Sequence, residues 1–75
     1  MIRMPYEERV AHIRYEGRSR TMPFITLDIG DLSSDRQVRR ALARYLDVPE
    51  RKLAPYVVER HATGNITVRP EAVFG

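Results

Sequence analysis

The sequence predicts an α+β domain in which one helix links two β-hairpins. Three patterns predict this: strand-like alternation near the N-terminus, apolar residues three and four apart in the middle, and two β-rich runs near the C-terminus. A chain of 75 residues has room for one hydrophobic core. We therefore expect a single domain over residues 1–75, with residues 1–8 and 70–75 less ordered than the rest.

The first strand is predicted over residues 10–15, where apolar and polar side chains alternate. Ala11, Ile13 and Tyr15 share one face, as in a half-buried strand. Residues 16–20 follow with a glycine and polar side chains suited to a hairpin turn.

The second strand is predicted over residues 21–29, with Ile25, Leu27 and Ile29 facing the core. Proline cannot donate a ladder hydrogen bond, so Pro23 indicates that this strand lies at an edge of the sheet. An exposed edge leaves dimerisation open.

A helix is predicted to begin at the segment Ser34-Asp35-Arg36-Gln37, which fits a capping box. The helix should end near Leu46 or Asp47, because Pro49 disfavours helical geometry at the residue before it. Its apolar residues form one stripe that we expect to face the sheet: Val38, Ala41, Leu42, Tyr45 and Leu46.

After the helix, residues 50–53 are predicted to form a helical turn that points Leu53 into the core. Residues 56–60 and 66–69 are β-rich and flank a turn over residues 61–65. Pro70 should end the last strand, and Val73 and Phe74 could then dock against the sheet.

Rules for crossover connections place the first and last strands side by side and parallel, which gives the strand order 2-1-4-3 in a four-stranded mixed sheet. This arrangement over residues 10–69 resembles the ubiquitin-like β-grasp superfamily in element order and in the leucine-containing helix followed by a proline-containing loop. The resemblance implies the fold. The modifiers and sulfur carriers of that superfamily end in Gly-Gly, whereas this chain ends in Phe74-Gly75. A carrier role for Gly75 is therefore the least favoured hypothesis.

Candidate catalytic and metal-binding groups are sparse. The chain contains no cysteine, and the two histidines, His12 and His61, lack the spacing of metal ligands on a helix. Asp28, Asp31 and Asp35 fit a strand end, a turn and a helix start. Ser19, Ser33 and Ser34 have no neighbouring histidine in the sequence, and no phosphate-loop motif occurs. We expect no enzymatic activity, no cofactor and no metal.

The charge of the chain is formally +3, and its basic residues are twelve arginines and Lys52. Arg36, Arg40 and Arg44 follow one another at intervals of four, so they line one side of the predicted helix. This pattern is typical of a solvated outer face, or of a surface for an acidic partner or nucleic acid. The candidates for such contacts are Arg36, Arg39, Arg40, Arg44, Arg18 and Arg20.

A second candidate surface is the open face of the sheet, a mixed apolar and basic patch that Thr26 could extend. Its predicted protein-binding residues are Val10, His12, Arg14, Phe24, Val57 and Arg69. We expect a small, cytoplasmic, non-catalytic adaptor or accessory subunit that binds another protein, as a monomer or weak homodimer without membrane contact. The alternative hypothesis is nonspecific nucleic-acid binding through the arginine-lined helix.

Overall fold

The computed structural model describes residues 9–71 of the chain. Two antiparallel hairpins form one mixed sheet: β1 (Val10–Tyr15) with β2 (Arg18–Pro23), and β3 (Tyr56–Arg60) with β4 (Ile66–Pro70). The strand order is β2-β1-β4-β3, and β1 and β4 run parallel at its centre. The predicted order is thus confirmed, and Pro70 belongs to β4. Residues 1–8 and the predicted roles of Val73, Phe74 and Gly75 lie outside the described residues.

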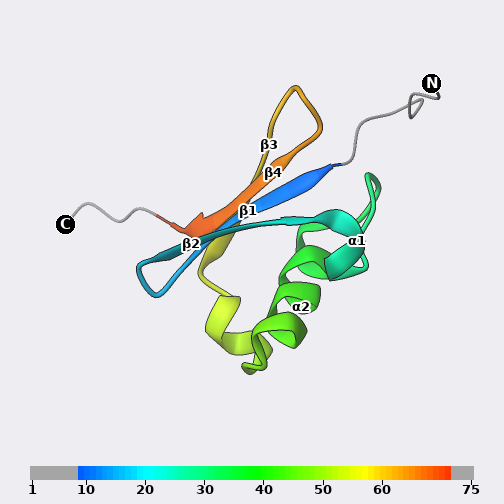
Figure 1. Cartoon of the computed structure of the whole chain (residues 1–75). Helices are drawn as coiled ribbons and strands as arrows, with labels where there is room; N and C mark the ends of the chain where they lie inside the picture. The colour runs from blue at the N-terminus through cyan, green and yellow to red at the C-terminus, as the bar shows by residue number, and fades with distance from the viewer. Residues whose placement is uncertain (1–8, 72–75) are drawn as a thin grey trace, which may run out of the picture.

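The helices all lie on one side of the sheet (Figure 1). The main helix, α2 (Asp35–Leu46), begins with the predicted capping box, because the Ser34 hydroxyl accepts from the Gln37 amide and the Gln37 side chain accepts from the Ser34 amide. It ends where Asp47 adopts a left-handed conformation. A 3₁₀ helix, η1 (Glu50–Leu53), then leads into β3.

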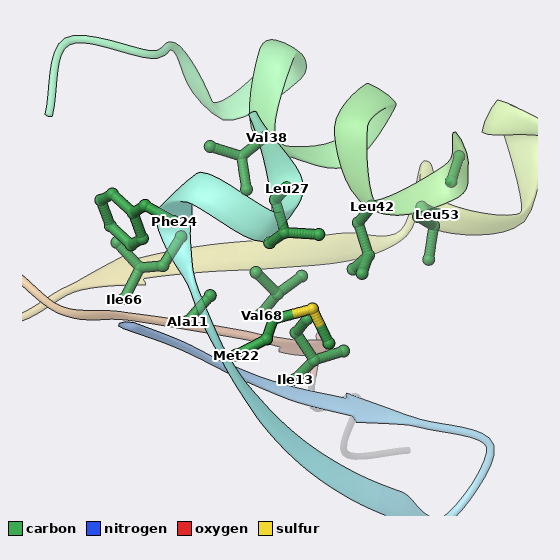
Figure 2. Packing of buried hydrophobic residues seen from close by; sticks show 11 residues of the cluster. Ala11, Ile13, Met22, Phe24, Leu27, Val38, Leu42, Leu53, Ile66 and Val68 are labelled. Carbon is green, nitrogen blue, oxygen red and sulfur yellow. The ribbon is translucent and has the colours of Figure 1, made fainter. Parts of the chain in front are cut away.

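The core lies between the sheet and these helices. Figure 2 shows side chains from both layers meeting there: Ala11, Ile13, Met22, Phe24, Leu27, Val38, Leu42, Leu53, Ile66 and Val68. Leu53 is fully buried, as the sequence predicts. Within residues 9–71, no helix is long and apolar enough to cross a membrane.

The prediction of a second strand over residues 21–29 is wrong beyond Pro23. The chain instead turns into a short helix, α1 (Phe24–Leu27), directly after Pro23. The Phe24 amide still donates to the Arg9 carbonyl beside β1. Phe24 and Leu27 are three residues apart, so one helical turn buries both. Ile25, which we predicted to face the core, is 80% exposed, and Ile29 is half-buried.

The first hairpin turn is shorter than predicted. Glu16 and Gly17 alone form it, both with positive φ (52° and 78°), which is the geometry of the two-residue turns that match the twist of a hairpin. Arg18, Ser19 and Arg20 are therefore part of β2.

The apolar stripe of α2 is rotated from the predicted one. Val38 and Leu42 are buried and Ala41 is half-buried, but Ala43 is buried too, and Tyr45 is 45% exposed. The Val48 amide donates to the Ala43 carbonyl and closes the end of the helix, and η1 packs against α2. The prediction that Tyr45 belongs to the core is wrong.

Candidate functional site

The face of the sheet opposite α2 is not covered by any helix of residues 9–71 (Figure 1). His12 and Arg14 of β1 point to this face. The residues that pair with them on the neighbouring strands lie on it too, because directly paired residues point to the same side. We call this surface the open face and define it by His12, Arg14, Ser19, Thr21, Val57, Glu59, Thr67 and Arg69.

Hydrogen bonds organise the polar side chains of the open face. Nδ1 of His12 lies 3.0 Å from the Thr21 hydroxyl, and Nε2 of His61 lies 2.7 Å from the Thr67 hydroxyl. The first contact links β1 to β2. The second links the residue that follows β3 to β4. Each contact restrains the two side chains that it joins.

A salt bridge crosses the same face from β4 to β3. Nε of Arg69 donates to Oε1 of Glu59 at 2.9 Å. The hydrogen bond and the charge of Arg69 lower the pKa of Glu59, and the same contact raises the pKa of Arg69. Both groups therefore stay charged near neutral pH.

A shallow depression of about 320 Å³ lies on the open face over β1, β2 and β4. The residues around it include three that carry hydroxyl groups and three arginines, with His12 and Ile13 between them: Ser19, Thr21, Thr67, Arg14, Arg20 and Arg69. Arg14 is exposed and takes part in no ion pair among the described residues. The depression thus offers donors to an acceptor group such as a carboxylate.

The predicted protein-binding set is only partly brought together on this face. His12, Arg14, Val57 and Arg69 are on it, and half-buried Val10 lies at its edge. Phe24 is not: it is 8% exposed and part of the core (Figure 2), because α1 turns it toward α2. Thr26 lies in α1, on the helix side. The face is therefore more polar than the sequence suggested.

Sequence reasoning missed the hydroxyl groups of the open face. Ser19 and Thr21 alternate with buried Met22 along β2, so the period of two could have found them. The predicted turn over residues 16–20 left Ser19 outside the strand. The predicted inward face of Ile25, Leu27 and Ile29 placed Thr21 on the core side, because residues two apart share a face.

The arginines of α2 lie on two different sides of the helix. Arg36, Arg40 and Arg44 are exposed, whereas Arg39 is half-buried on the side of Asp35 and Ala43. Asp35 accepts from Arg60 of β3 at 2.6 Å, so that side faces β3. Arg36, Arg40 and Arg44, which were predicted to line one side of the helix, are thus all exposed, and Arg39 lies apart from them.

The outer arginines differ in what they contact. Nε of Arg40 lies 3.2 Å from Oε2 of Glu50, an ion pair that ties α2 to η1. Arg36 and Arg44 have no ion-pair partner among residues 9–71. Arg40 and Arg44 also line a groove of about 210 Å³ between α1 and α2, with Asp28 on its opposite wall.

A third hollow, of about 290 Å³, lies near the start of β1 and is lined by Arg9, Arg60, His61 and Phe24. Its arginines are already engaged: Nε of Arg9 bonds to Asp31 at 3.2 Å, and Arg60 bonds to Asp35. The charges there compensate one another, so this hollow has little attraction for an ion.

Ser33 and Ser34 serve in a turn and a cap as predicted, whereas Ser19 lies in β2 and Asp28 ends a helix and not a strand. The Ser33 hydroxyl accepts from the Gly30 amide, the Ser34 hydroxyl caps α2, and Asp28 ends α1 in a left-handed conformation. Among residues 9–71, no three histidine, aspartate or glutamate side chains gather as a metal site would require.

Comparison with known proteins finds no matching family model, no similar curated protein and no similar solved structure.

Proposed function

We propose that this protein is a non-catalytic protein-binding module of the ubiquitin-like β-grasp superfamily, and that its open face takes an acidic segment of another protein. The arrangement that supports the superfamily is a helix packed across a mixed four-stranded sheet with parallel first and last strands at its centre.

One observation carries the proposed function: a sheet face without helical cover holds side chains that are already ordered by hydrogen bonds. His12, Thr21, Thr67 and Arg69 are each fixed by a neighbour on the face or at its rim. Arg14 adds a positive charge with no ion-pair partner among the described residues. Arginine and hydroxyl donors around a shallow depression suit carboxylates, and half-buried Val57 offers a small apolar contact.

The experiment has two steps. A photo-crosslinking residue in place of Thr21 captures the partner in cells that make the protein, and the same residue in place of Arg51 on η1 serves as the control on the helix side. The captured protein is then purified, and its affinity for the wild type and variants is measured by isothermal titration calorimetry.

Arg14→Glu should weaken binding at least fivefold, because an exposed ion pair contributes up to about 1 kcal/mol and a reversed charge adds repulsion. Arg51→Glu changes the net charge equally on the other side of the sheet and should leave the affinity nearly unchanged. Equal losses in the two variants, or equal crosslinking from the two positions, would refute the open face as the docking surface.

A further inference from the structure

Positive charge is distributed unevenly between the two sides of the sheet. The four ion pairs use Arg9, Arg40, Arg60 and Arg69. Among residues 9–71, eight basic residues have no ion-pair partner, and only Arg14 of these lies on the open face. The others belong to β2 or to the helical layer: Arg18, Arg20, Arg36, Arg39, Arg44, Arg51 and Lys52. The helical side therefore has the stronger attraction for a polyanion.

An exposed aromatic side chain lies among these charges. Tyr45 follows Ala41 by one helical turn, so it extends the side of α2 that forms the groove with α1. Arg44 precedes it directly and lines that groove. With 45% of its surface exposed, the Tyr45 ring offers a surface on which a base can stack.

Strand β2 brings two further arginines to the same side of the sheet. Arg20 pairs with Ile13 and Arg18 with Tyr15. Ile13 is buried beneath the helices, so the paired arginines also point to the helical side. β2 is the edge strand that leads into α1, and it therefore lies beside the α2 side that carries Tyr45.

We propose that this side of the molecule binds single-stranded nucleic acid without sequence preference. We call it the Tyr45 surface and define it by Arg18, Arg20, Arg44 and Tyr45. Arginines would contact backbone phosphates, and the Tyr45 ring would stack on an unpaired base, the combination used for single strands. A duplex keeps its bases stacked inside, so it could use only the arginines.

The proposal is independent of the open face, because the two surfaces lie on opposite sides of the sheet. Its test is fluorescence anisotropy with a labelled 20-nucleotide single strand of DNA or RNA, and with the matching duplex. Three phosphate contacts predict that affinity for the single strand falls about 20-fold between 50 and 200 mM salt. The duplex should bind more weakly than the single strand at the same salt concentration.

Three variants separate stacking from general charge attraction. Tyr45→Ala should weaken single-strand binding about 5- to 150-fold, the range measured for loss of one stacked base, whereas Tyr45→Phe should retain it. Arg44→Gln should weaken binding. It should also reduce the slope of affinity against salt concentration by the amount that about one phosphate contact contributes. Arg14→Gln removes the same charge from the open face and should change the affinity less than twofold. Circular dichroism confirms that each variant is folded.

Several outcomes would overturn the proposal. Equal losses from Arg14→Gln and Arg44→Gln would mean that net charge alone attracts the strand. Unchanged binding by Tyr45→Ala would remove the stacking role. Equal competition by polyglutamate would assign the surface to acidic proteins, and a failure to bind any oligonucleotide at 50 mM salt would end the idea.

Discussion

Leu53 provides a sharp test of the packing, because it is a core residue supplied by a four-residue 3₁₀ helix. Its side chain is 0% exposed, and Leu53→Ala should leave a cavity that so short an element cannot close. Truncation of a buried leucine costs about 2–5 kcal/mol. A 75-residue domain has a total stability of about 4–11 kcal/mol, so the variant should lose a large part of it.

Leu32 offers a matched control, since the same substitution there removes a side chain that is 96% exposed. Leu32→Ala should change the free energy of unfolding by less than about 0.5 kcal/mol. Urea denaturation followed by circular dichroism measures both variants, and a loss of about 3 kcal/mol in Leu53→Ala would lower Tm by roughly 12–24 °C. Similar stabilities for the two variants would show that η1 is a surface linker and that the core is misassigned.

Three further predictions concern local structure. Ser34→Ala should destabilise the protein by about 1 kcal/mol, because the Gln37 amide loses its capping acceptor; an unchanged urea midpoint would contradict the cap. Glu16→Asn should stabilise the first hairpin by up to about 1 kcal/mol, because asparagine tolerates positive φ better; a lower Tm would argue against the two-residue turn. Burial, and then the charge of Tyr15, raise the pKa of Tyr56 above its usual 10.0, so the unfolded chain releases this proton first and stability falls as pH rises above 10. Tyr56→Phe should lose part of that decline in urea titrations between pH 9 and 11, and an identical decline would refute the assignment.

The sequence predicts the fold well where pattern and local chemistry agree. The capping box at Ser34, the alternation of Ala11 and Ile13 and the position of Leu53 each rest on local rules that packing did not override. The strand order follows from connection rules once the elements are known.

The errors arise where two periodicities compete. Residues 25, 27 and 29 alternate as in a strand, while Phe24 and Leu27 have helical spacing. The chain follows the helical spacing, which buries both Phe24 and Leu27. On α2, the spacing of the apolar residues defines a broad stripe. Which part of that stripe is buried depends on the elements that pack against either side of the helix. The packing of η1 against α2 is one such contact, and no local pattern specifies it.

These two differences between prediction and structure also change which residues form the candidate sites. The turn into α1 removed Phe24 from the open face and left a surface of hydroxyls, histidine and arginine. Because the buried stripe of α2 differs from the predicted one, Tyr45 is exposed next to Arg44 in the sequence. An exposed aromatic ring is what a surface of arginines needs in order to stack on a base.

The central claim is that the open face is the docking surface for a protein partner. Backbone amide chemical shifts, recorded by NMR as the captured partner is added, test it most directly. The largest changes in chemical shift should occur at His12, Arg14, Thr21, Thr67 and Arg69, with small changes along α2. Changes concentrated on α2 and β2 around Tyr45, with the central strands unaffected, would contradict it.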